Sequence, residues 1–376
     1  MEILNGTPFL LEATQATEKS GQTLLVILVK GTFDFPAVDG ELPQAARQQV
    51  PVLVADQFEG EPGVSSPLFE CDYATRKRRC DVIVRASACA PQGQPVAELD
   101  AAFRVGACEK WAHVVGDRVW QRGVIDLKPS APQPFVRMPI SYGRAYGGSC
   151  EERGLIYAQE ANPVGRGYSG PQRLADLHGQ PVPNVEQPGV PIERADAAYT
   201  PWSFGPIGRS WQPRLRLAGT YDEHWQEEIF PLLPADFDDG FFQCAPPDQQ
   251  IDFPRGGEDV RLLNLHPTRP HIHFPLPNLD MPLAVLDRQQ KLHFPQAVVD
   301  AVTLDAESAQ LIVTWRAQLP LKRNLREVQL LAGGNVCRRW WKSRVLGTAD
   351  CGCGGIETDD EDLAPVTAPL HGWEEA

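Results

Sequence analysis

The side chains best suited to metal chemistry are four histidines late in the chain: His266, His271, His273 and His293. His271 and His273 stand two residues apart, so on a strand they would point to one face and could share a metal ion. No Cys, Asp or Glu stands at a spacing that would complete the ligand set. A metal-dependent hydrolase that uses these histidines with an acid is therefore an alternative, and an exposed strand face is the favoured interpretation.

Two glycine-containing motifs could bind a ligand. Residues 165–170, Gly-Arg-Gly-Tyr-Ser-Gly, match the dinucleotide pattern G-x-G-x-x-G, which requires a strand before it and a helix that opens within it. Because Asn162-Pro163 precedes this stretch and Pro171 follows it, a turn-rich loop is favoured. Cys351 and Cys353 flank one glycine and would form only a weak metal or redox site.

Motifs for nucleophilic catalysis do not occur in the sequence. Gly-x-Ser-x-Gly and Ser-x-x-Lys are both missing, and no cysteine stands in a context typical of a catalytic thiol. We therefore expect a protein that is not an enzyme, with no catalytic, cofactor-binding or metal-binding residues.

Cations and aromatic side chains alternate near the C-terminus, at Arg338, Arg339, Trp340 and Trp341. This composition can stack bases and hold phosphates, which leaves a carbohydrate- or nucleic-acid-binding β module as an alternative. A solvated strand edge is a plainer explanation, because charged edges block unwanted pairing, and the acidic tail could also fold back onto the segment. Trp and Arg are enriched in interface hot spots, so we rank a protein partner above nucleic acid here.

Four further aromatic residues are candidates for partner contact: Trp202, Phe204, Trp211 and Trp225. For any single one of them, pinning a loop onto the core is favoured over lining a partner groove. Three of the four belong to a Gly- and Pro-rich stretch, 129–213, that we interpret as long ordered loops. Loops on a rigid scaffold commonly carry binding, so this stretch is where we expect a partner.

Short strands must position these side chains, because Gly and Pro number 32 and 35 and follow no period. The apolar run 24–29 is typical of a strand buried on both faces, and the turn at Asp39-Gly40 follows it. The Gly116-Asp117 turn predicts a hairpin between 111–115 and 118–120. Further strands are expected at 81–86, 101–105, 260–263, 272–276, 302–304 and 311–315.

Helical signals are few. Asp222 can cap a short helix over 222–229, whereas 321–331 fits a helix face or a strand equally well. The predicted fold class is all-β, mainly antiparallel and sandwich- or barrel-like, with long ordered Gly/Pro-rich loops and one or two short helices.

The chain divides by composition into four predicted parts: an N-terminal β module (1–128), the loop-rich connection (129–213), a C-terminal β module packed on the first (214–347) and a flexible acidic tail (348–376). Much of the net charge of −14 lies in that tail. The body therefore gives no electrostatic reason to bind nucleic acid or an anionic membrane.

Features of an exported or membrane protein are not seen in the sequence. The first ten residues, MEILNGTPFL, lack the basic and apolar regions of a signal peptide, and the longest apolar run is too short to span a bilayer. The nine cysteines include no Cys-x-x-Cys pair, which is typical of reduced thiols. We expect a cytoplasmic protein that does not bind membranes.

About a dozen short stretches between Asn5 and Pro320 resemble, in order, the effector adaptors or chaperones of type VI secretion, a family long catalogued as a domain of unknown function. The stretches combine turn-forming Gly and Pro with isolated aromatic residues. They include 5–9 (NGTPF), 29–33 (VKGTF), 65–68 (SSPL) with Glu70 and Asp72, 116–120 (GDRVW), 138–140 (MPI), 146–148 (YGG), 162–165 (NPVG), 204–207 (FGPI), 211–214 (WQPR), 218–222 (AGTYD), 234–238 (PADFD) and 245–249 (APPDQ).

The resemblance implies a role and not a reaction. Members bind a toxic effector through its PAAR-like N-terminal region and load it onto the VgrG spike, while the adaptor stays in the cytoplasm. The family pattern includes no catalytic residues, so none is carried over. This chain lacks the pentapeptide-repeat extension of some relatives, and its Cys351-Cys353 segment and acidic tail lie outside the resembling stretches.

Overall fold

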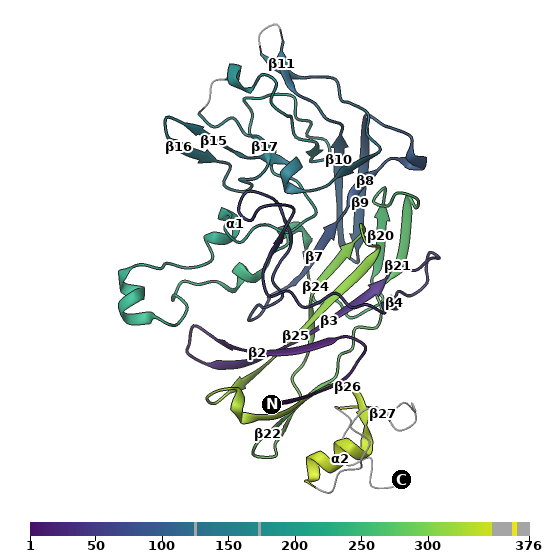
Figure 1. The fold of residues 1–376 in the computed structure, drawn as a ribbon, viewed down its shortest axis with the longest axis vertical. Coiled ribbons are helices and arrows are strands. Elements are labelled where there is room, and N and C mark those ends of the chain that lie inside the picture. The colour runs from purple at the N-terminus through teal and green to yellow at the C-terminus, as the bar shows by residue number, and fades with distance from the viewer. Residues whose placement is uncertain (124–125, 172–173, 348–362, 367–376) are drawn as a thin grey trace.

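The structure is a computed structural model that describes residues 1–123, 126–171, 174–347 and 363–366. Its described residues form three large sheets and several two-stranded ribbons, and nearly all strand pairs are antiparallel. The predicted all-β class is therefore confirmed. Figure 1 shows an elongated molecule with the loop-rich region around β11 and β15–β17 at one end and α2 at the other.

The central sheet carries the longest strands of the molecule. The predicted strand over 24–29 is part of β3, and its side chains are almost fully buried. β3 pairs with β25 along its whole length, and β7 joins β24 in parallel. The strands, in sheet order, are β19 (Gln250–Ile251), β7 (Cys80–Arg85), β24 (Val298–Asp305), β25 (Gln310–Leu321), β3 (Thr23–Asp34) and β2 (Leu10–Thr17), with β4 (Gln44–Ala45) on β3.

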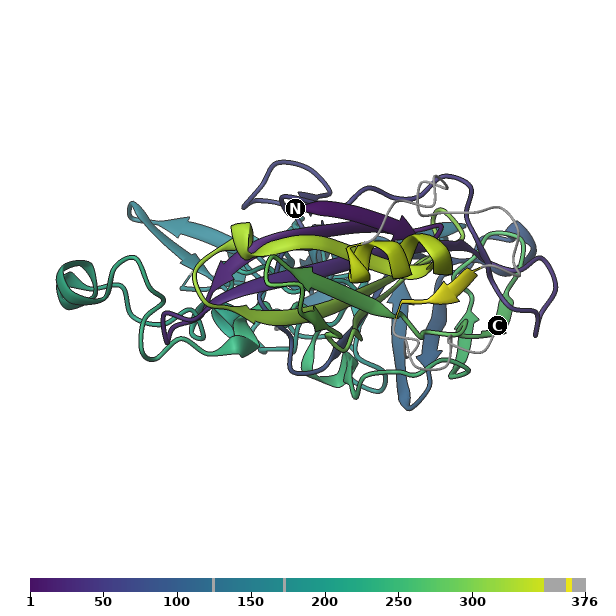
Figure 2. The same ribbon diagram turned by 90° about the horizontal axis from the view of Figure 1, so that it is seen from below.

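Two five-stranded sheets pack near the central one. In the second sheet the order is β18 (Val185–Glu186), β10 (Cys108–Val115), β9 (Glu98–Val105), β20 (Asp259–Leu263) and β21 (His271–Pro275). The third sheet has β1 (Glu2–Gly6), β26 (Val328–Cys337), β22 (Leu283–Asp287) and β23 (Leu292–His293), with β27 (Leu363–Pro365) also on β26. Viewed from below, α2 (Arg338–Leu346) lies against this third sheet (Figure 2).

Shorter elements connect the sheets. The ribbons are β5 (Gln57–Phe58) with β6 (Pro67–Phe69), β8 (Ser87–Cys89) with β13 (Arg137–Pro139), β11 (Trp120–Arg122) with β12 (Leu127–Pro129), β14 (Tyr146–Gly147) with β17 (Arg166–Gly167), and β15 (Ser149–Glu152) with β16 (Leu155–Ala158). Helical segments are α1 (Gln212–Leu215), η1 (Pro91–Gly93), η2 (Tyr142–Arg144), η3 (Leu174–Leu177), η4 (Trp225–Ile229), η5 (Asp239–Phe242), η6 (Pro247–Gln249) and η7 (Leu325–Glu327).

One large hydrophobic core joins the three sheets. It takes side chains from the central sheet, the second sheet and the third sheet together, and Trp315 lies within it with its indole N–H bonded to the Leu279 carbonyl oxygen at 2.7 Å. Strands from the two predicted β modules are also interleaved, because β3, β7 and β9 pair with β25, β24 and β20. The predicted modules 1–128 and 214–347 thus contribute strands to the same sheets and side chains to the same core.

Local predictions have mixed outcomes. The predicted helix at 222–229 forms as η4 and its preceding turn, and the Asp222 carboxylate accepts a hydrogen bond from the Trp225 N–H at 2.9 Å. In the ambiguous segment 321–331, strand β26 begins at Val328. The predicted hairpin across Gly116-Asp117 is wrong. Gly116 instead donates its N–H to the Ala97 carbonyl oxygen, and a Cβ there would overlap the Gln133 carbonyl.

The C-terminal region differs from two expectations. Arg338–Leu346 forms helix α2, not a strand edge, and Gly347 ends it with a left-handed backbone, φ 64°. Within the predicted flexible tail, Leu363–Pro365 pairs with Asn335–Cys337 of β26. Ala364 and Val366 are buried there, so the tail does fold back beside the start of α2 at this point. The Cys351-Cys353 segment lies outside the described residues.

Candidate functional site

The central sheet has two unlike faces. Successive side chains along β3 and β25 point to opposite faces of the sheet. Ile27, Val29 and Val313 lie in the apolar core. Lys30, Thr314 and Arg316 lie on the opposite side. On that side the charged groups are buried beneath loops, where an unpaired charge would be very costly. We call this side of the sheet the polar face; it carries Lys30, Thr32, Asp81, Ile83, Arg85, Asp300, Thr303, Asp305, Ile312, Thr314 and Arg316.

Ion pairs on the polar face fix the loops that cover it. Lys30 pairs with Asp72 at 2.7 Å, and its Nζ also donates to the Pro51 carbonyl oxygen at 3.0 Å. Arg316 pairs with Asp300 and donates to the carbonyl oxygens of Asp72 and Ala74. Two strands thereby bind the segment 51–74 through buried cations. Removing one partner of such a buried pair strongly destabilises the folded protein.

Asp81 holds a second loop to the polar face. Its fully buried carboxylate pairs with Lys77 at 2.7 Å and accepts hydrogen bonds from the Gln243 side chain and from the N–H groups of Cys244 and Ala245. Burial alone would lower the pKa of Lys77, but the Asp81 carboxylate raises that pKa above its ordinary value, so the ammonium stays charged. Burial raises the pKa of the Cys244 thiol, which makes this cysteine a poor nucleophile.

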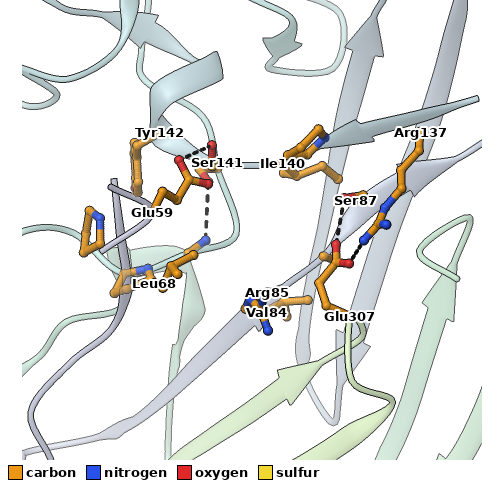
Figure 3. A pocket seen from close by; sticks show the side chains of 16 residues that line it. Glu59, Leu68, Val84, Arg85, Ser87, Arg137, Ile140, Ser141, Tyr142 and Glu307 are labelled. Atoms are coloured by element: carbon orange, nitrogen blue, oxygen red, sulfur yellow. Dashed lines mark hydrogen bonds and ion pairs between the residues drawn. The ribbon is translucent and has the colours of Figure 1, made fainter. Parts of the chain in front are cut away.

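The loops held in this way surround a cleft of about 530 Å³ (Figure 3). Its wall on one side is β13, which is paired with β8 so that Pro139 lies opposite Ser87. Another wall is the segment around η2, where the Gly143 N–H donates to the Ser66 hydroxyl at 2.5 Å. The cleft is defined by apolar Pro67, Leu68, Val84, Ile140, Tyr142 and Pro206 and by polar Glu59, Arg85, Ser87, Arg137, Ser141 and Glu307.

Most polar side chains of the cleft have a hydrogen-bond or ion-pair partner within it. The Glu307 carboxylate accepts a hydrogen bond from Ser87 at 2.7 Å and pairs with Arg137, as Figure 3 shows. Across the cleft the Ser141 hydroxyl donates to Glu59 at 3.3 Å. Such a mixture of apolar surface and a few fixed polar groups is typical of a binding site.

The guanidinium of Arg85 is committed to the sheet. It donates to both carboxylate oxygens of Asp305 on β24, at 2.9 and 3.1 Å, and lies over the Phe69 ring at 5.7 Å. Because the same nitrogen, Nη1, donates to both oxygens, the guanidinium stays against β24. Arg85 therefore forms part of the floor of the cleft and does not offer a free cation to a ligand.

The predicted loop aromatics lie close to this region, mostly inside the core. Phe204 is fully buried and meets Phe103 edge-on at 5.0 Å, and Trp211 is buried edge-on against Tyr142 at 5.1 Å. Their burial favours the loop-pinning role over direct contact with a partner. Residues next to Phe204, namely Ser203, Gly205 and Pro206, line the cleft.

Trp202 and Trp225 are only partly buried. The Trp202 indole donates to the Trp111 carbonyl oxygen at 2.7 Å, and Lys110 lies 4.5 Å above its ring. Trp225 donates to the Leu232 carbonyl oxygen and packs edge-on against Tyr221 and Phe230, outside the cleft. Contact of these two residues with a partner remains a prediction.

The basic–aromatic segment at the C-terminus lies on α2, far from the cleft-lining strands in Figure 1. Trp340 and Trp341 are buried in a second core with Leu4 and Val366, and Arg338 and Arg339 are exposed. The two tryptophans thus hold α2 to the third sheet. A base-stacking surface would need these rings exposed, and they are not.

The histidines and the glycine motif do not form a site. His271 and His273 share a face of β21, and His273 pairs with Asp259 at 2.6 Å. Among the described residues, no three His, Cys, Asp or Glu side chains are grouped so that they could hold a metal ion. Residues 165–170 form a loop around the short strand β17, and no helix begins within them, which confirms the turn-rich interpretation.

Sequence reasoning missed the charged residues of the cleft. Arg137 and Glu307 are far apart in sequence and belong to no motif, and only the pairing of β8 with β13 and the turn after β24 bring them together. One signal was available: a charged residue within an apolar strand, as Asp81 in β7, must find a partner when it is buried.

No helix in the described part of the chain is long and apolar enough to cross a membrane. In comparisons with known proteins, neither a curated protein nor a solved structure matches the chain. A family model does match residues 20–316, which include the second sheet, the central sheet except β2 and the end of β25, and the cleft with its loops. By this match over most of its length, the chain belongs to the family described as an uncharacterized protein conserved in bacteria, DUF2169.

Proposed function

We propose that the protein is a non-enzymatic adaptor that binds a type VI secretion effector by its PAAR-like N-terminal region and loads it onto the VgrG spike. One observation carries the proposal: three of the stretches that resemble the adaptors, 65–68, 138–140 and 204–207, contribute walls to one cleft. Stretches from three distant parts of the chain that meet at one concave surface are expected of a shared binding site.

The make-up of the cleft supports binding of a protein segment. Leu68, which is half-buried, and Pro139, which is exposed, offer an apolar surface, and the Arg137–Glu307 pair supplies both a donor and an acceptor at its side. Buried ion pairs hold the surrounding loops in place, so a partner would meet a preformed surface and little ordering entropy would be lost.

The test is to fill the cleft and to measure effector binding. Ser141 lines the cleft, and its side chain makes only the weak bond to Glu59, so Ser141→Trp adds bulk with little cost to the core. Ser20→Trp adds the same bulk in an exposed turn far from the cleft in sequence and space. With an effector that has a PAAR-like N-terminal region as the candidate partner, we expect Ser141→Trp to weaken binding at least about tenfold and Ser20→Trp to leave it unchanged.

A second arm tests the role in secretion. Deletion of the adaptor gene should lower the amount of soluble effector and of effector bound to the spike, and the Ser141→Trp variant should fail to restore either. The proposal is wrong if the effector stays soluble and reaches the spike equally well without this protein.

A further inference from the structure

The outward face of the second sheet carries a groove that the cleft does not explain. Strand alternation places Phe103 and Leu262 in the core and their neighbours Arg104 and Arg261 in solvent. A hollow of about 450 Å³ lies over this face, within the size range of small-ligand sites. We call it the sheet groove; Arg104, Glu109, Trp111, Arg261, Leu263 and His271 line it.

The strand register arranges these side chains in two rows. Across β10, β9 and β20, the first row is Glu109, Arg104 and Arg261, and His273 of β21 continues it. The second row is Trp111, Ala102, Leu263 and His271 on the same four strands. Ala102 is the smallest residue of the eight, so it forms the floor between the taller neighbours.

Arg104 and Arg261 stand directly opposite each other, an arrangement that is unfavourable for like charges. Arg261 has a carboxylate partner, Asp259, at 2.7 Å. Arg104 donates only to its neighbouring Gly106 carbonyl oxygen, and no carboxylate among the described residues lies within ion-pairing distance of it. An anionic oxygen group placed between the two guanidiniums would relieve this repulsion through charge-assisted hydrogen bonds.

Trp111 adds an exposed ring next to the arginine pair. Its side chain is 42% exposed, and its indole N–H donates to the Glu109 carboxylate at 2.8 Å, which fixes the ring. Glu109 is the cross-strand neighbour of Arg104, but its carboxylate bonds to the indole and forms no ion pair with that guanidinium. A flat ligand with an apolar face could pack against the indole above Ala102.

The mixed charges decide what kind of anion fits. Glu109 and Asp259 flank the arginine pair and would repel a polyacid, but they can accept hydrogen bonds from neutral hydroxyl groups. β9 and β20 are paired on both sides, and the edge strand β21 is engaged at His273, whose N–H and carbonyl oxygen bond to Asp39 and Gly40, so little free strand edge is offered to a peptide. These features suit a ring that has one anionic group and several hydroxyls.

We propose that the sheet groove binds an anionic saccharide, with its carboxylate between Arg104 and Arg261 and a sugar face on Trp111. The groove shares no lining residue with the cleft. This inference therefore goes beyond the proposed adaptor function and is tested independently of it.

The test uses calorimetric titration of the full-length chain with three trisaccharides, each of which joins a single uronic acid (galacturonate, mannuronate or guluronate) to two neutral hexoses and so carries one carboxylate. Maltotriose is the neutral control and a pentaglutamate peptide is the polyacid control. We expect at least one uronate to bind at least about tenfold more tightly than either control. Arg104→Ala and Trp111→Ala should each weaken binding of that uronate at least about tenfold. Arg194→Ala removes the same charge from an exposed loop and should change the affinity less than about twofold.

Several outcomes overturn the proposal: no uronate binds more tightly than about 10 mM, pentaglutamate or maltotriose binds as tightly as the best uronate, or the two groove variants bind like the unmodified protein. Thermal unfolding checks that each variant is folded. If Arg104→Ala melts early, Arg104→Gln, which keeps the length of the side chain and removes its charge, takes its place.

Discussion

At the scale of single residues, the charges that matter most for the fold are those beneath the loops. Asp81, Lys77, Asp300 and Arg316 are all buried, and each cation there lies next to a carboxylate. A buried ion pair adds little net stability compared with well-packed apolar residues, but it penalises every arrangement in which one partner is left alone. The pairs therefore fix where the covering loops lie, and with them the walls of the cleft.

Asp81 is the residue whose loss should cost most. Asp81→Ala leaves the Lys77 ammonium and the Gln243, Cys244 and Ala245 donors buried without their acceptor, so we expect about 3–5 kcal/mol of destabilisation. Asp81→Asn should fall between this variant and the unmodified chain, because an amide oxygen still accepts hydrogen bonds. Urea unfolding measures the difference.

Asp252 provides the matched control for that experiment. It is also an aspartate beside an arginine, Arg79, but its side chain is 98% exposed. Exposed pairs of this kind contribute little, so Asp252→Ala should leave the urea midpoint unchanged. Equal midpoints for Asp81→Ala and Asp252→Ala would show that the buried network does not hold the loops.

Tyr73 gives a pH-dependent prediction. Its hydroxyl donates to the Glu12 carboxylate on β2, and this bond, with burial, raises the pKa of Tyr73 from 10.0 to about 12. The neutral phenol thus contributes stability that is complete below pH 10 and is lost as the pH rises toward about 12. Unmodified protein should unfold at a higher urea concentration than Tyr73→Phe below pH 10, and the gap should narrow above it. A gap that is constant over this range would contradict the assignment.

At the scale of elements, strands with apolar residues on both faces were predictable and charged helices were not. The run 24–29 could only be a buried strand, and it lies in β3. Arg338–Leu346 has no strong helical pattern, and its helix is stabilised because Leu4, residues of β26 and Val366 bury Trp340 and Trp341. The cleft was predictable only in part: motif stretches supply walls, but Arg137 and Glu307 meet through tertiary pairing that no local pattern encodes.

The strand β27 is expected to hold α2 in place. Truncation after Gly347 removes the buried Ala364 and takes Val366 out of the second core, and burial of one such valine contributes about 1.5–3 kcal/mol. Backbone amides of Asn335–Cys337 and of α2 should then exchange with solvent at least about tenfold faster. Truncation after Val366 keeps β27 and should leave these rates unchanged. Equal rates in the two truncated proteins would show that β27 contributes nothing to this end of the molecule.

At the scale of the whole molecule, the chain crosses repeatedly between sheets. β3 pairs with β25, which lies 276 to 298 residues later in the chain, and β7 pairs with β24, 220 residues later. In the second sheet β9 pairs with β20. The cleft depends on the same crossing, because its residues come from 59–87, 137–142, 203–206 and 307. A binding surface built in this way exists only when the entire sheet system has formed.

This interleaving predicts that the compositional modules do not fold separately. A fragment of residues 1–128 would expose the edge of β3 that β25 covers and the edge of β7 that β24 covers, and a fragment of 214–347 would lose the same pairs from the other side. Each would also divide the shared apolar core. We expect both fragments to give poorly dispersed amide NMR spectra when expressed alone, and the two together with 129–213 to unfold in one transition. A dispersed spectrum from either fragment would mean that its own contacts suffice, and that the long-range pairs join modules already formed.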